Sequence, residues 1–238
     1  MSLEKDNYVW IEYIFDFEEP KSDKRFLVLL DKKNLIALPP ENLVDEGEEN
    51  RWTDLDFHQC EICPLSKNDV KKCPIAKNIS GLAKEFSDIY SIEQVNITVN
   101  TQERSYFKRD SVQQGLRSIL GIYLATSGCP HMEILKPMAR FHLPFASMEE
   151  TIYRQVSNYL LSQYFAFLDG KIPDINLKKL EDKNNFINLV NQGMCNRIDC
   201  VTEADSNKNA LIILNAVNLM LGIELQTKLD SLKYLFKN

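Results

Sequence analysis

The sequence has few of the patterns that mark common nucleotide-dependent and hydrolytic enzymes. Only 8 of its 238 residues are glycine, and the glycine patterns of P-loop and dinucleotide-binding proteins are absent. The glycine-flanked serine of the α/β-hydrolases is missing as well. These absences argue against nucleotide chemistry on those folds and against a serine hydrolase of that class.

Excess positive charge, a long apolar run and an apolar leader are also lacking. Lys and Arg number 28 against 34 Asp and Glu, for a formal net charge of -6. General nucleic-acid binders are usually basic, so we expect no nucleic-acid partner. The longest apolar run, 210–225, is interrupted by Asn215, Asn218 and Glu224 and is shorter than the roughly 20 residues of a membrane span. With no leader in residues 1–6, we expect a cytoplasmic protein without a membrane segment.

The first 110 residues are dominated by two-residue alternation, which is typical of half-buried strands. Ile11, Tyr13 and Phe15 fall on one face, with Glu12 on the other. One helix is predicted in this half, over 75–89. The alternation predicts five antiparallel strands, at about residues 8–17, 25–30, 35–38, 95–99 and 103–108.

From residue 111 onward, apolar residues recur every three or four positions, which predicts helices. Ser147 and Glu150 form a capping-box pattern at the start of one helix that should end near Leu168. A stripe on this helix predicts a core-facing surface, formed by Tyr153, Val156, Leu160, Tyr164 and Phe167. Other helices are expected at about 111–125, 177–197 and 203–221, with a short one through Leu229 and Leu232.

The order of these segments predicts an α+β fold. An N-terminal antiparallel sheet of about five strands should pack with a C-terminal layer of four or five helices. We expect a β-rich region with a cysteine-containing loop at 1–110, a helical region at 111–238, and one compact unit formed from both.

Cysteine provides the strongest chemical pattern in the chain. Cys60 and Cys63 are separated by two residues, Cys73 follows, and Cys129 comes later in a Gly-Cys-Pro turn. Thiols stay reduced in the cytosol, so the cluster is better interpreted as a metal site than as disulfides. A Cys-x-x-Cys unit directs two sulfurs at one ion, and Cys73 and Cys129 would complete a tetrahedron.

Three interpretations of these thiols remain open. Zinc accepts four thiolates, or three with an imidazole from His58 or His131, and would join the sheet half to the helical half. An iron-sulfur cluster also uses four cysteines, and proline follows Cys63, Cys73 and Cys129 as in the Cys-Pro end of a ferredoxin motif. Alternatively, the thiols are small buried hydrophobic groups that bind no metal.

A second cluster of polar residues lies in the segment 128–142 between predicted helices. It provides histidines and cations that could bind a small anionic ligand or support acid–base chemistry: His131, Lys136, Arg140 and His142, joined by Arg154 from the next helix. The alternative is a connector whose histidines only bond to backbone carbonyls. A cysteine hydrolase based on Cys129 lacks a recognised signature around that residue.

The sequence therefore predicts a soluble protein with a structural zinc site, acting as a binding or regulatory module for a protein or a small anionic ligand. A closed four-thiolate shell leaves no open position for chemistry, which favours binding over catalysis. The alternatives are an iron-sulfur redox protein and an enzyme that uses the His131–His142 loop. No catalytic residue is assigned.

Overall fold

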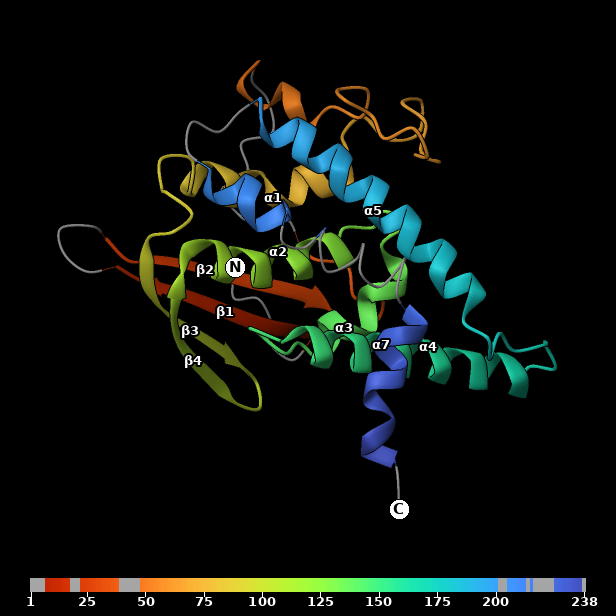
Figure 1. Cartoon of the computed structure of the whole chain (residues 1–238). Coiled ribbons are helices and arrows are strands. Elements are labelled where there is room, and N and C mark those ends of the chain that lie inside the picture. Colours follow the sequence, from red (N-terminus) through yellow and green to blue (C-terminus); the bar gives the residue numbers. More distant parts are fainter. Residues whose placement is uncertain are drawn as a thin grey trace.

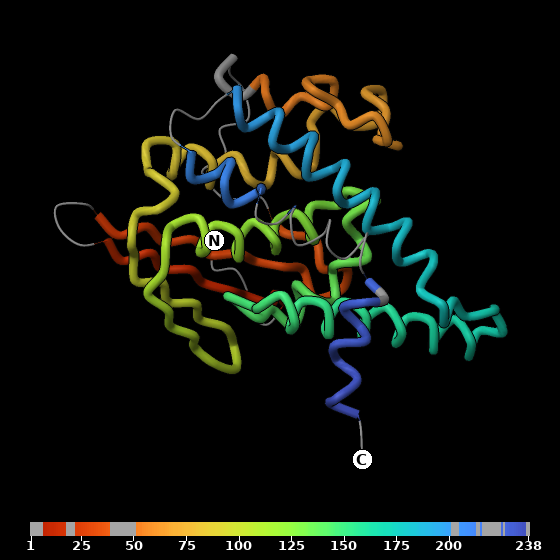
Figure 2. Tube along the Cα trace, in the orientation of Figure 1, coloured from red at the N-terminus to blue at the C-terminus, as the bar shows by residue number. Residues whose placement is uncertain are grey.

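The computed structural model describes residues 7–17, 22–38, 48–200, 205–212, 215 and 225–236. Its architecture is α+β, as the sequence predicts, with an antiparallel sheet on one side and helices on the other (Figure 1). Helices α2 (Val112–Ala125) and α1 (Pro74–Glu85) lie successively above the sheet in this view. The same path is seen in the tube along the chain (Figure 2).

The sheet has four strands in the order β2-β1-β3-β4, and all neighbouring pairs are antiparallel. The strands are β1 (Tyr8–Asp16), β2 (Lys24–Asp31), β3 (Gln94–Thr101) and β4 (Ser105–Ser111). Buried and partly exposed residues alternate along β1. Tyr13 pairs with Phe26 on one side and with Val99 on the other, which places it in the middle of the sheet.

The remaining helices follow the sheet in the chain. They are α3 (Lys136–Arg140), α4 (Met148–Leu168), α5 (Lys178–Ile198) and α7 (Leu225–Leu232), with 3-10 turns at Glu48–Thr53, Glu133–Leu135 and Lys233–Phe236. Residues 206–212 are also helical, whereas the rest of the helix predicted at 203–221 lies largely outside the described residues. None of the helices in the described ranges has the length and apolar character needed to cross a membrane.

The core is formed by the inner face of the sheet packed against α1 and α2. An aromatic cluster joins the layers, with the Phe15 and Phe86 ring centroids 5.0 Å apart and those of Phe26 and Phe86 5.6 Å apart. Gly115 of α2 lies directly over Phe15. A Cβ at this position would overlap the Phe15 ring and come within 2.7 Å of Ile97 Cδ1. The glycine therefore lets α2 approach the sheet closely.

The prediction of a fifth strand at 35–38 is wrong. The segment forms a single bridge between Ala37 and Leu30 instead of a ladder. Leu35 adopts a positive φ of 56°, which turns the chain away from an extended path. The Leu38 amide donates to the Leu29 carbonyl of β2 at 2.8 Å, but the Ala37 amide donates to the Thr126 carbonyl at the end of α2 at 2.9 Å, so pairing with the sheet does not extend into a ladder.

The capping box at the start of α4 is confirmed. Ser147 Oγ accepts from the Glu150 amide at 3.2 Å, and the Glu150 carboxylate accepts from the Ser147 amide at 2.8 Å. The predicted core stripe on the same helix is mostly wrong, since only Val156 of its five members is buried. Tyr164 is 55% exposed and Phe167 60% exposed.

The exposure of the stripe follows from the path of α4. Its C-terminal half extends past the sheet and meets the start of α5 at a projecting tip (Figures 1 and 2). Near its start, Ile152, Val156 and Tyr159 pack with Leu180 of α5 and Leu225 of α7 in a small second core. An apolar stripe predicts that a helix needs a partner, but it does not tell how far that partner extends.

We expect Gly115→Ala to destabilise the protein by about 1–3 kcal/mol, because the added methyl group overpacks the contact between α2 and the sheet. The free energy of unfolding in urea measures this loss. Gln114→Ala on the same helix is the control and should change stability by less than about 0.5 kcal/mol. Equal stability of Gly115→Ala and the parent chain would contradict the close contact.

Candidate functional site

The first candidate site is the cysteine cluster, and the structure brings its two chain segments together. The Cys63 amide donates to the Cys60 carbonyl at 2.9 Å in a tight turn. Cys73 lies at the start of α1, where its amide donates to the Thr53 carbonyl at 2.7 Å. The turn that carries Cys129 contacts the first turn through His131, whose Nε2 lies 2.8 Å from the Ile62 carbonyl oxygen.

The surroundings of Cys129 and Cys60 disfavour ionisation of their thiols. Burial raises the pKa of Cys129 to about 11, and the thiols of Cys73 and Cys60 contribute in the same direction. The backbone N–H groups of His131 and Met132 act oppositely and favour the thiolate. The pKa of Cys60 is also raised, by burial first and then by Cys73 and Cys63.

The side chains do not, however, form a finished metal site. Across the described ranges, no group of three or more His, Cys, Asp or Glu side chains is placed to hold a metal ion. His131 uses Nε2 on the Ile62 carbonyl, and His58 Nε2 lies 3.7 Å from Cys200 Sγ. The thiols have the donor chemistry of a zinc site, but the described side chains are not arranged around one ion.

Arg197 of α5 holds the chain just before the cysteines. Its side chain is 1% exposed and donates to the carbonyls of Trp52, Asp54 and Leu55 at 2.7, 2.8 and 2.9 Å. One turn earlier, a Cβ on Gly193 would come within 2.6 Å of Cys60 Sγ. Helix α5 therefore packs directly on the segment that carries the first two thiols.

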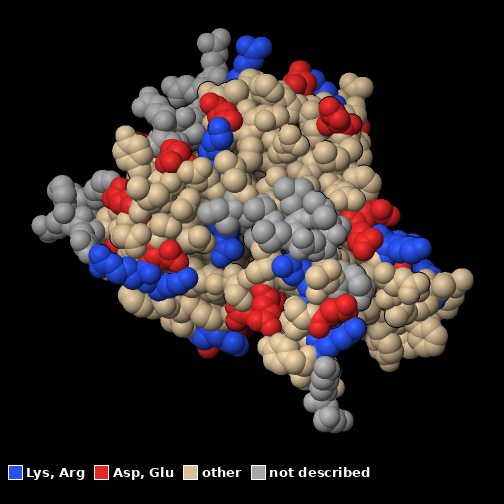
Figure 3. Space-filling model, viewed as in Figure 1, with Lys and Arg blue, Asp and Glu red and all other residues tan. Residues whose placement is uncertain are grey.

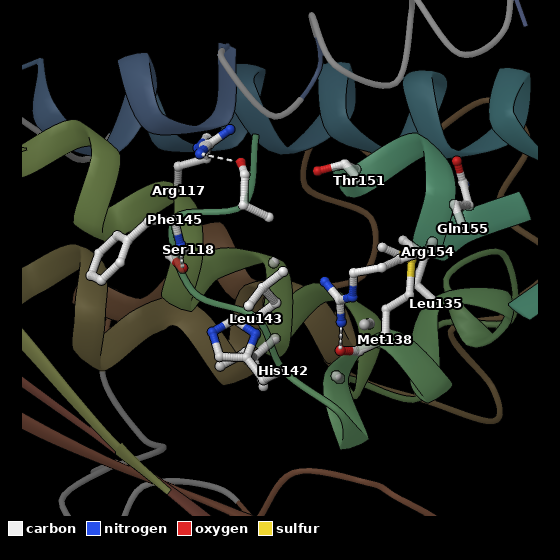
Figure 4. A pocket seen from close by; sticks show the side chains of 15 residues that line it. Arg117, Ser118, Leu135, Met138, His142, Leu143, Phe145, Thr151, Arg154 and Gln155 are labelled. Atoms are coloured by element: carbon white, nitrogen blue, oxygen red, sulfur yellow. Dashed lines mark hydrogen bonds between the residues drawn. The ribbon is translucent and has the colours of Figure 1, made fainter. Parts of the chain in front are cut away.

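The second candidate site is a cavity of about 140 Å³ between α2, α3 and α4 (Figure 4). Its wall combines a few polar side chains with many apolar ones. The polar members are Arg117, Ser118, His142, Thr151, Arg154 and Gln155, and the apolar members include Ile122, Ala125, Leu135, Met138, Leu143 and Phe145.

Two guanidinium groups face this cavity, and no Asp or Glu is among its lining residues. Arg154 donates to the carbonyls of Met138 and Phe141 at 2.9 and 2.6 Å. Arg117 donates to the Ala146 carbonyl at 3.2 Å, and its buried Nε has no hydrogen-bond partner among the described residues. Burial lowers the pKa of both arginines. The Asp110 charge opposes this effect at Arg117 and the Glu150 charge opposes it at Arg154, and neither carboxylate lines the cavity. Backbone carbonyls and carboxylates outside the wall therefore balance the two guanidinium charges.

A hydrogen-bonded chain connects the cavity to the centre of the sheet. The buried Tyr13 hydroxyl donates to Ser118 Oγ at 2.9 Å and lies 2.5 Å from His142 Nε2. Burial, reinforced by the Arg154 charge, lowers the pKa of His142 to about 3, although part of the residue reaches the surface. Burial also raises the pKa of Tyr13 well above its usual range. Both groups are therefore uncharged at pH 7.

The structure distributes the five predicted ligand residues over different places. His142 and Arg154 line the cavity, and both also line an adjacent cavity of about 320 Å³ that includes Arg140. Lys136 pairs with Glu133 at 2.8 Å, while His131 contacts the Ile62 carbonyl and the Phe186 ring. Lys136 and His131 are in the lining of neither cavity.

Sequence reasoning missed the lining residues Arg117, Ser118, Thr151 and Gln155, and Tyr13 behind them. Arg117 and Ser118 form a polar pair within the apolar stretch of α2, and this interruption is the signal that could have indicated them. Tyr13 gave no such signal, because a tyrosine in an alternating strand is typical of a core position. On the face shown in Figure 3, acidic and basic side chains are interspersed, so no broad basic surface pointed to the two arginines either.

Comparison with known proteins identifies the family but no activity. Residues 11–237 match the family described as Domain of unknown function (DUF6901), and the chain belongs to this family. A search of curated proteins found no match, and a search of solved structures found none.

We expect the protein to lose stability as the pH falls from 6.5 toward 3. The folded-state pKa of His142 is about 3 against a usual value of 6.5, so the unfolded chain binds an additional proton in this window. Between pH 6.5 and 5, the free energy of unfolding should fall by about 1–2 kcal/mol. We expect a value near the lower end of this range because the imidazole ring is partly exposed.

Urea unfolding at a series of pH values measures this effect. His142→Gln keeps an N–H group that can donate to the Tyr13 oxygen but does not titrate, so it should flatten the pH dependence. The parent chain, unfolded in the same series of buffers, is the reference for the slope. An unchanged slope in His142→Gln would contradict the low pKa.

Proposed function

We propose that this member of the DUF6901 family is a binding protein that takes a small anionic ligand in the cavity between α2, α3 and α4. The observation that carries the proposal is the presence of Arg117 and Arg154 in one cavity wall without an acidic side chain. Removing a guanidinium group from water is costly unless an opposite charge compensates it. Backbone carbonyls supply only partial charges, and the Asp110 and Glu150 carboxylates that act on the two arginines lie outside the cavity lining.

The protonation states favour binding over acid–base catalysis. His142 is neutral at pH 7 and holds no proton that it could readily release as a general acid. With its pKa near 3, it is also a poor general base. The Tyr13 phenol keeps its proton and is buried behind the cavity wall. These groups therefore support a site that recognises a charge without transferring a proton.

Charge removal at either arginine should weaken anion binding. We expect Arg117→Gln and Arg154→Gln each to reduce affinity by about 10- to 100-fold, since each replaces a charged donor with a neutral one. Thermal-shift screening at constant ionic strength with acetate, pyruvate, benzoate, phosphate and sulfate would find the anion, and calorimetry would measure its affinity.

Arg25→Gln is the matched control, because Arg25 is an exposed arginine on β2 outside this cavity. Arg154→Lys retains the positive charge. If Arg154→Gln loses affinity and Arg154→Lys keeps it, the loss is due to the missing charge and not to a disturbed cavity wall. The proposal is wrong if no anion binds to the folded parent chain, or if the Arg25 variant loses as much affinity as the two cavity variants.

A structural zinc ion at Cys60, Cys63, Cys73 and Cys129 is the second part of the proposed function. It is supported by the approach of two segments that are far apart in the sequence, and by the N–H groups directed at the Cys129 sulfur. Four thiolates on zinc would supply a cross-link between the loop before α1 and the turn after α2. Zinc in such a closed shell has a structural role, which agrees with a binding protein.

Elemental analysis and a visible spectrum of protein purified without added metal or chelator test this part. We expect about one zinc per chain in a colourless sample, loss of the metal in Cys129→Ser, and retention in Cys195→Ser. Cys195 is half-buried against the core and lies outside the cluster. Iron with a broad visible absorption would favour the iron-sulfur alternative, and absence of metal under reducing conditions would exclude both.

A further inference from the structure

We propose that the anion is a carboxylate carried by an apolar body about the size of one six-membered ring. This inference rests on the proposed function, because it takes the arginine-lined cavity as the binding site and specifies the ligand class. Three properties of the cavity support it: its volume, the apolar part of its wall, and the number and direction of its hydrogen-bond donors.

The volume of the cavity suits a small apolar body. The cavity measures about 140 Å³, and an engineered protein cavity of about 150 Å³ holds one benzene molecule. A ring or a branched chain of about six carbon atoms therefore fits inside this cavity.

The apolar wall selects for a hydrophobic body. Ile122 and Ala125 of α2 contribute to the apolar lining. Leu135, Met138 and Leu143 contribute the rest of this part of the wall (Figure 4). Water against such a wall gains few hydrogen bonds, so its replacement by apolar ligand atoms is favourable. A fully polar anion such as phosphate would leave this part of the cavity without a suitable partner.

The donors suit a carboxylate. Ser118 Oγ accepts from the Tyr13 hydroxyl at 2.9 Å and from the Phe145 amide at 3.3 Å. With these two acceptor positions occupied, the hydroxyl hydrogen of Ser118 is available to a ligand in the cavity that Ser118 lines. Arg117, at the preceding position of α2, lines the same cavity and brings a positive charge to it.

Tyr13 and His142 position the Ser118 hydroxyl. Because Tyr13 donates to Ser118, its oxygen accepts from His142 Nε2, and the neutral imidazole therefore carries its proton on Nε2. All hydrogen bonds in this chain then run from His142 through Tyr13 to Ser118. Aligned hydrogen bonds of this kind polarise one another and make the last hydroxyl a better donor to a negative oxygen.

Calorimetric titration at pH 7 with benzoate, benzyl alcohol and inorganic phosphate tests the ligand class. We expect one benzoate to bind per chain, at least about tenfold more tightly than benzyl alcohol, which has the ring without the charge. Phosphate, which has the charge without the ring, should bind at least about tenfold more weakly than benzoate.

Three substitutions locate the ligand. Ser118→Ala should weaken benzoate binding by about tenfold, and Ser118→Thr, which retains the hydroxyl, should restore it to within about threefold. Met138→Trp fills the cavity without removing a polar group and should abolish benzoate binding while the chain stays folded. Ser157→Ala, at an exposed position of α4, is the control and should bind like the parent chain.

The outcomes separate this inference from the proposed function. Phosphate or acetate binding that depends on Arg117 and Arg154, without preference for benzoate, would overturn the ligand class and leave anion binding intact. Benzoate binding that survives Met138→Trp would place the ligand elsewhere and overturn the inference. Failure of every anion to bind would overturn both proposals.

Discussion

The buried hydroxyl of Tyr13 is the constraint on which the cavity wall depends. Tyr13 lies in the central strand β1 with 0% exposure, so its hydroxyl needs partners within the protein. Ser118 of α2 supplies one and His142 supplies the other. These two bonds set the rotation of α2 over the sheet and hold the segment after α3 against it. The position of the cavity follows in part from satisfying this one buried polar group.

The two candidate sites share one stretch of chain. Helix α2 provides Arg117 and Ser118 to the cavity and then leads into the turn that carries Cys129. Helix α3 follows and returns the chain to the cavity at His142. A metal at Cys129 would therefore hold one end of the segment that forms the cavity wall, and Arg197 holds the facing cysteine loop through three backbone carbonyls.

The two halves of helix α4 differ in their environment: the first half is packed against the rest of the protein and the second half is exposed. Its first turns provide Thr151, Arg154 and Gln155 to the cavity and pack in the small second core. Its later turns project beyond the sheet with large exposed side chains such as Phe165 and Phe167 (Figure 1). The capping box at Ser147 starts the helix at a defined residue, which sets the direction in which Arg154 faces.

The sequence by itself determined the α+β class, four of the strands, most helix positions and the capping box, because these depend on local periodicity and on residues close in the chain. It also indicated His142 and Arg154 as neighbours of a polar loop. Only the tertiary structure decided that Arg117, Ser118 and Tyr13 join them, that the segment at 35–38 bonds to the end of α2, and that the α4 stripe is exposed. These features depend on contacts between residues far apart in the sequence, and local patterns contain no information on which distant surface meets which.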